Sequence, residues 1–163
     1  MKKLIISGLL CLGIISCEDK SPVDREIERV FFENAQISLS ENAGVYPLWE
    51  GGSNLVFRFT LKHPDEPNIA DDELSEIFWI EIPSNRESFE LSKGKSDDAD
   101  FETIYTRACY CFIPEAFEFD HLMVRGNKIS DEQWSITFEM STQNEYGTYE
   151  LNDSGNYTVS TFN

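Results

Sequence analysis

The sequence predicts an all-β domain, arranged either as an antiparallel β-sandwich or as a partly closed β-barrel of about eight or nine strands. Apolar and polar residues alternate with a period of two along much of the chain, and aromatic residues make up 13% of it. Turn sequences rich in Gly, Asn and Asp separate the alternating segments. Alternation gives each strand one face for a core, and turns at short intervals are typical of sandwiches and barrels.

The first strands are expected between residues 31 and 62. Ile37 and Leu39 alternate with polar residues before a turn at 42–44, and Gly51-Gly52 precedes a clearer strand. Every second residue of that strand is apolar, namely Leu55, Phe57, Phe59 and Leu61. Ahead of these strands, Ser21-Pro22 and the helical spacing of apolar residues over 23–31 leave two states open, a short helix or an extended spacer.

Further strands are expected over 77–82, 89–91 and 101–112, because these segments are rich in β-branched and aromatic residues. A strand over 122–124 leads into a turn at 125–127, and 134–140 shows the cleanest alternation in the chain. Two last strands, over 146–151 and 157–162, are joined across Asn152-Asp153-Ser154-Gly155, a typical turn sequence. The last three strands therefore predict an antiparallel meander.

The chain of 163 residues has 30 acidic and 13 basic residues, for a net charge of −17. Residues 30–163 suffice for a single domain with a substantial core. The excess of negative charge disfavours nucleic acid and anionic headgroups as partners, because both would be repelled.

The amino terminus has the pattern of a secretory signal peptide. Met1-Lys2-Lys3 precedes an apolar run over residues 4–15, which is shorter than the roughly 20 residues that a membrane-spanning helix needs. The sequence Ile14-Ile15-Ser16-Cys17 then resembles the lipobox of bacterial lipoproteins. The resemblance implies that residues 1–16 are a signal peptide, that Cys17 carries acyl chains such as palmitate, and that 17–29 form a tether. The alternative is an ordinary signal peptide with an incidental cysteine.

Two further resemblances concern location. The acidic residues in Glu18-Asp19-Lys20 are similar to the export signal of surface-exposed lipoproteins in the Bacteroidota. The tail from Met123 resembles small cell-surface lipoproteins of the same phylum, in the segments Val124–Gly126, Trp134–Met140, Gly147–Tyr149 and Tyr157–Ser160. These resemblances imply a protein anchored by lipid in the cell outer membrane. They leave open which leaflet holds the anchor, and therefore whether the domain is exposed at the cell surface. They imply no activity.

Cys109 and Cys111 are the two cysteines outside the amino-terminal segment. On a flat strand, residues i and i+2 stand farther apart than the roughly 3.8 Å between Cβ atoms that a disulfide requires. The sequence leaves free buried thiols and a strained disulfide open, with metal ligation much less favoured.

Asp97, Asp98, Asp100 and Glu102 form a weak calcium candidate, although a solvated acidic loop is the favoured interpretation. His63 and His121 have no spacing to the cysteines that would indicate zinc, and both are expected at the surface. We therefore expect no cofactor and no metal.

Trp49 and Trp79 are candidates for stacking on a sugar or a peptide, although a place in the core is favoured for each. The sequence contains no Gly-x-Ser-x-Gly, phosphate-loop or His-Glu-x-x-His motif. It predicts a non-catalytic, lipid-anchored surface β-domain, not an enzyme, that binds or assembles with a glycan, peptide or protein. A calycin-like small-ligand carrier is the alternative, and an apolar lumen would favour it, whereas a filled core would favour the binding module.

Overall fold

The computed structural model describes residues 25–39, 47–64, 74–93, 101–108, 118–144 and 147–161. These residues form nine β-strands, which confirms the all-β prediction. In chain order the strands are β1 Glu26–Leu39, β2 Pro47–Gly51, β3 Asn54–Lys62, β4 Ser75–Pro83, β5 Ser88–Ser92, β6 Glu102–Ala108, β7 Phe119–Ser130, β8 Gln133–Asn144 and β9 Gly147–Ser160.

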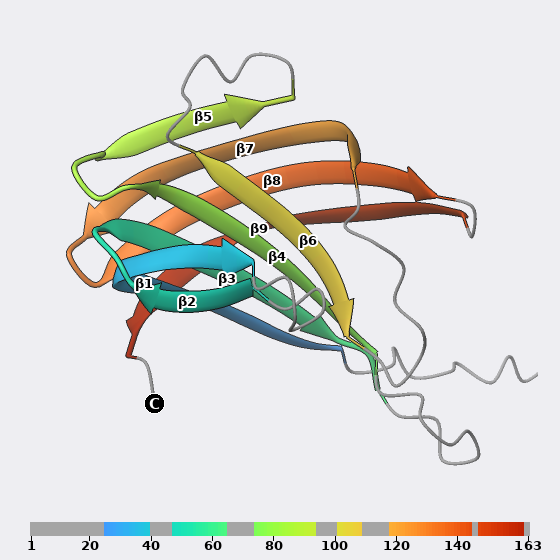
Figure 1. Ribbon diagram of the computed structural model, residues 1–163, viewed down its shortest axis with the longest axis horizontal. Coiled ribbons are helices and arrows are strands. Elements are labelled where there is room, and N and C mark those ends of the chain that lie inside the picture. The colour runs from blue at the N-terminus through green and yellow to red at the C-terminus, as the bar shows by residue number, and fades with distance from the viewer. Residues whose placement is uncertain are drawn as a thin grey trace, which may run out of the picture.

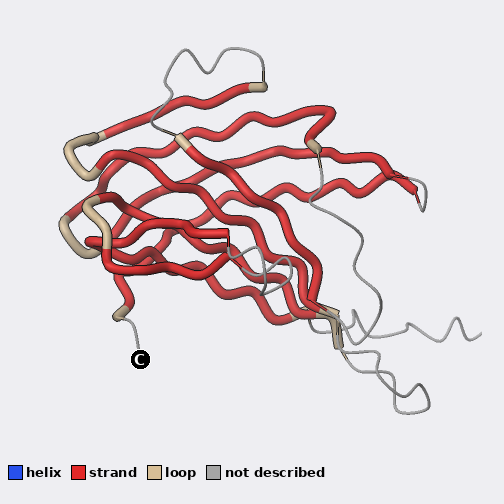
Figure 2. The backbone as a smooth tube through the Cα atoms, in the orientation of Figure 1, coloured by secondary structure: helices blue, strands red, loops and turns tan. Residues whose placement is uncertain are grey.

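The strands belong to one strongly curled sheet that forms a half-barrel (Figures 1 and 2). The order across the sheet is β5-β7-β8-β9-β1-β3-β4-β6, and β2 pairs with β1 outside this path. The expectation of a wholly antiparallel sheet is wrong, because β1 and β9 run parallel. A sandwich of two separate sheets is not what the described strands form.

The parallel pairing divides the sheet into two antiparallel halves. Strands β5, β7, β8 and β9 form one half, and β1, β3, β4 and β6 form the other. The two halves share only a short backbone pairing, in which Val30, Phe31 and Phe32 of β1 lie opposite residues 158–160 of β9. Their common apolar core must therefore supply most of the contact between them.

Aromatic side chains fill that core on the concave side of the sheet. Alternate residues of β3 and β4 point into it, as the period of two predicted, and Phe57, Phe78 and Ile80 are buried there. From the other half, Trp134, Phe138 and Tyr157 reach the same core. Burial of large side chains from both halves is the main stabilising contribution to this fold.

A smaller apolar cluster lies on the outer face of β3, β4 and β6, where residues from the second part of β1 cover Val56, Trp79 and Ile104. Strand β1 changes direction at Asn34, whose φ is +53°, and the carbonyl of Asn34 accepts a bond from Gly52 N at 2.7 Å. Asparagine is one of the few residues other than glycine that adopts this left-handed conformation at low cost.

One open alternative is decided and two local expectations are wrong. Of the short helix and the extended spacer, the described residues 26–31 adopt an extended conformation, as part of strand β1 paired with β3. The turn expected at 125–127 lies inside β7, where Gly126 pairs with both Ile136 and Phe89. The turn expected at 152–155 lies inside β9, in register with residues 136–139 of β8. In each case long-range strand pairing outweighs a local turn or helix preference.

Candidate functional site

The outer face of β7, β8 and β9 is polar, because the alternation of these strands sends their apolar residues to the core. The register places the outward residues in rows that cross the three strands. Ser141 lies opposite both His121 and Glu150, and in the next row Glu139 lies opposite Met123 and Asn152. The strands thus arrange hydroxyl, carboxylate, amide and imidazole groups at fixed spacings.

An open groove of about 730 Å³ lies along this face, and we call it the β8–β9 groove. Its polar lining comes from all three strands, chiefly from His121, Glu139, Ser141, Glu150, Asn152 and Ser154. His121 and both glutamates are exposed. Side chains of this kind bind a ligand through hydrogen bonds and charge.

The β8–β9 groove carries negative charge. Glu139 and Glu150 contribute carboxylates, and the described residues that line the groove include neither Lys nor Arg. The nearest cation in the row pattern is Arg125, which lies opposite Thr137. Its Nε is 3.2 Å from Oε2 of Glu90 on β5, so its charge is partly neutralised on the side away from the groove.

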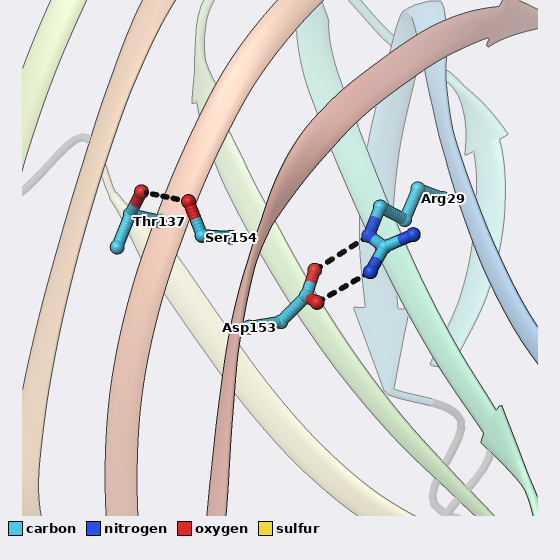
Figure 3. Close-up of polar contacts among 4 residues, drawn as sticks. All are labelled: Arg29, Thr137, Asp153 and Ser154. Carbon is cyan, nitrogen blue, oxygen red and sulfur yellow. Dashed lines mark hydrogen bonds and ion pairs between the residues drawn. The ribbon is translucent and has the colours of Figure 1, made fainter. Parts of the chain in front are cut away.

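Thr137 and Ser154 form a cross-strand pair at one end of the groove. Their hydroxyl oxygens lie 2.8 Å apart, and either one is able to donate (Figure 3). Each hydroxyl has one donor and two acceptor positions, so the bond leaves hydrogen-bonding capacity on both side chains for a ligand. Both residues are exposed.

Asp153 lies between two groove residues in sequence but points to the opposite face. Its carboxylate accepts two bonds from Arg29 of β1, from Nε at 2.7 Å and from Nη2 at 2.5 Å (Figure 3). The hydrogen bond to Asp153 raises the pKa of Arg29, against the opposing effect of burial. A Cβ added at Gly155 would lie 2.5 Å from Arg29 Nε, so the close approach of this arginine requires glycine there. This ion pair bridges β1 and β9 beside their short parallel pairing.

A second group of polar side chains lies near the ends of β3, β4 and β6. His63 Nε2 is 3.3 Å from Glu76 Oε1, and the Arg107 guanidinium lies 4.5 Å from the centre of the Tyr149 ring. Burial raises the pKa of Tyr105 in the same region, and the charge of Glu76 adds to the effect. His63 was expected at the surface, whereas its side chain is about three-quarters buried. We interpret these contacts as structural, because they join β3, β4 and β6 to β9.

The structure places Trp79 in the outer apolar cluster, where it is 3% exposed. The guanidinium of Arg58 lies 5.7 Å from its ring centre. A role for Trp79 in stacking on a ligand is therefore wrong for this fold, and the favoured core interpretation holds. Trp49 lies in β2 opposite Ile37, and its side chain is outside the described part of the chain.

Most other predicted sites fall outside the described residues, namely Cys17, Cys109, Cys111, Asp97, Asp98 and Asp100. Glu102 is described at the start of β6, opposite Glu81 of β4. Burial raises the pKa of Glu102, and the neighbouring charge of Glu81 raises it further. Within the described ranges, no three His, Cys, Asp or Glu side chains form a group that would hold a metal ion.

Sequence reasoning missed the β8–β9 groove because it predicted a turn within β9. The sequence over 152–155 has the composition of a turn, and this interpretation divided β9 into two strands. The one signal in the sequence is the even spacing of Leu151 and Tyr157, which would place both side chains on the same face of a single continuous strand.

Comparison with protein-family models, with curated proteins and with solved structures gives no match to this chain. Among the described residues, the structure contains no helix with the length and apolar character needed to cross a membrane.

Proposed function

We propose that this protein is a lipid-anchored, non-catalytic β-domain that binds a glycan, peptide or protein partner at the cell surface. The β8–β9 groove carries the proposal, because it is an open polar concavity built by three paired strands. Its exposed groups are suited to recognition through hydrogen bonds and charge.

The filled core favours a binding module over the alternative of a small-ligand carrier. Trp134, Phe57 and Phe138 occupy the concave side of the half-barrel, where a carrier would need an apolar lumen. Between the edge strands β5 and β6 there is an apolar pocket of about 330 Å³, lined in part by Leu91, Phe101 and Phe119. This pocket is open and less than half the size of the β8–β9 groove.

The lipid anchor belongs to the same proposal and rests on the lipobox-like sequence that ends at Cys17. We expect mass spectrometry of the protein purified from its native membrane to find Cys17 as the amino-terminal residue, carrying acyl chains. We expect the Cys17→Ala variant, which has no thiol to carry acyl chains, to be lost from the membrane fraction. An unmodified terminus at another residue would remove the anchor from the proposal, together with the outer-membrane location.

Binding itself is tested with the purified full-length protein in neutral detergent on glycan and peptide arrays. We expect reproducible binding without chemical change of the ligand, and its loss in the double variant Glu139→Ala, Asn152→Ala. The matched control is Ser135→Ala, Asn156→Ala, which changes an outward cross-strand pair nearer the other end of the same strands. Equal binding by all three proteins would show that the β8–β9 groove is not the site, and ligand turnover would contradict the non-catalytic proposal.

A further inference from the structure

We infer that the partner in the β8–β9 groove is an extended, basic segment of another polypeptide. The inference rests on the proposed function and specifies the class of ligand for that site. It follows from the charge of the groove, its shape and the kinds of side chain that line it.

Charge complementarity selects a cationic partner. Glu139 and Glu150 are both exposed in the groove, and its described lining contains neither Lys nor Arg to offset them. The whole chain carries a net charge of −17, so the long-range field attracts cations as well. An anionic glycan or an acidic peptide would be repelled at long range by the net charge of the chain and at short range by the two carboxylates in the groove.

The shape of the groove selects an extended chain. Its β8 side runs from Thr137 to Ser141, which is about 14 Å at the rise of an antiparallel strand. An extended segment of four or five residues spans the same length. Ser141, Asn152 and Ser154 are placed to hydrogen-bond with the backbone of such a segment, while the two carboxylates receive Lys or Arg side chains.

The lining disfavours a neutral glycan. Binding pockets for small neutral ligands are lined largely by apolar and aromatic side chains, with a few polar groups to fix orientation. Phe138 is the aromatic residue among those that line the groove, and its side chain is 1% exposed because it faces the core. The groove therefore offers a sugar ring no exposed face of a Phe, Tyr or Trp side chain, whereas a basic peptide needs none.

Fluorescence anisotropy with three labelled octapeptides tests the inference on the full-length protein in neutral detergent. The peptides alternate Lys, Glu or Gln with Ser, so they differ in charge and share length. The test variant is Glu139→Gln, Glu150→Gln. The control variant, Glu33→Gln, Glu132→Gln, removes two exposed carboxylates from β1 and from the β7–β8 turn. Both variants lose the same charge, and circular dichroism checks that both are folded.

We expect the Lys peptide to bind the unmodified protein and the control variant, with weaker binding at higher salt. We expect the test variant to bind it about two- to thirtyfold more weakly, the range for losing two exposed ion pairs. Equal weakening in the two variants would overturn the inference, because net charge alone would then explain binding. Array binding to a glycan or a neutral peptide without binding to the Lys peptide would overturn it and leave the proposed function standing. No binding to any array or peptide would remove both.

Discussion

Arg29 joins the two halves of the sheet by charge where their backbone pairing is short. Its guanidinium donates two bonds to Asp153, whose side chain is 8% exposed, while the arginine side chain itself is 27% exposed. Paired bonds of this kind combine charge with fixed geometry, and the partial burial protects them from screening by salt. Loss of the arginine would leave a nearly buried carboxylate without its charged partner.

We predict that Arg29→Met lowers the free energy of unfolding by about 2–3 kcal/mol, somewhat below the loss for a fully buried pair. Urea denaturation measures the change. Arg125→Met is the matched control, because the ion pair of Arg125 with Glu90 is more than half exposed on both sides. We expect it to cost less than about 1 kcal/mol. Equal losses in the two variants would show that the Arg29–Asp153 pair has no special role in stability.

The raised pKa of Glu102 predicts the sign of a pH dependence of stability. Burial and the charge of Glu81 raise its pKa in the folded protein, so folding favours the protonated form. The stabilisation that comes from the bound proton is complete at pH values below the pKa of Glu102 in the unfolded chain. It is lost as the pH rises through the higher pKa that Glu102 has in the folded protein. We predict that Glu102→Gln is slightly more stable than the unmodified protein at pH 7. The difference should disappear as the pH falls to about 4, near the unfolded pKa of a glutamate. Thermal unfolding at several pH values measures it, and a gain that grew in acid would contradict the assignment.

Residue-level prediction from the sequence succeeded where a side chain's role follows from alternation, and failed where it depends on a distant partner. The inward places of Phe57, Phe59 and Trp134 follow from the period of two. The partnership of Arg29 with Asp153 joins residues 124 positions apart, and no local pattern indicates it. Trp79 was ambiguous because a strand residue on the outer face becomes buried only if another segment covers that face.

At the scale of elements, the edge strand β5 pairs with β7 along its length, and an aromatic ring of β5 also packs against a glycine of β7. Phe89 lies opposite Gly126, and a Cβ added at Gly126 would overlap the Phe89 ring. The glycine thus has a packing role inside a strand, in place of the turn that its sequence context suggested. Phe89 in turn contacts Trp134 and Phe57 in the core.

We predict that Gly126→Ala lowers the free energy of unfolding by about 1–3 kcal/mol, because the Phe89 ring must move out of a packed position. We also expect faster amide hydrogen exchange in β5. Gly51→Ala in β2 is the control, since an added Cβ there meets no atom within 4 Å. Its effect should stay within about 0.5 kcal/mol. An unchanged exchange rate in β5 of the Gly126 variant would show that Phe89 does not anchor this strand.

The strands were predictable to the extent that one face of each is buried. The segments 54–62, 75–83 and 133–144 are strands in the structure, and each contains a segment expected from alternating or apolar residues. The parallel pairing of β1 with β9 was not predictable, because it depends on how the two antiparallel halves meet at their common core. The continuous course of β7 and β9 was missed because glycine and asparagine in a strand resemble a turn when only neighbouring residues are considered.

On the scale of the whole molecule, Phe57 is the point where the two halves meet. Its ring centre lies 5.6 Å from that of Phe31, 5.9 Å from Phe89 and 5.3 Å from Trp134. These rings come from β1, β5 and β8, so one side chain of β3 contacts both antiparallel halves. Because the backbone pairing between the halves covers only three register positions, this aromatic contact is expected to decide whether they unfold together.

We predict that Phe57→Ala lowers the free energy of unfolding by about 3–5 kcal/mol, the range for removing a buried aromatic side chain. In the unmodified protein, far-ultraviolet circular dichroism and tryptophan fluorescence should report one coincident transition, because the halves share their core. The control is Val56→Ala in the outer cluster, which removes fewer buried atoms and leaves the contact between the halves intact. Val56→Ala should lower the free energy of unfolding by less than Phe57→Ala does. The transitions followed by circular dichroism and by fluorescence should stay coincident in this control. Separate transitions in the unmodified protein would mean that each half is stable alone, and the shared aromatic core would then not be what unites the half-barrel.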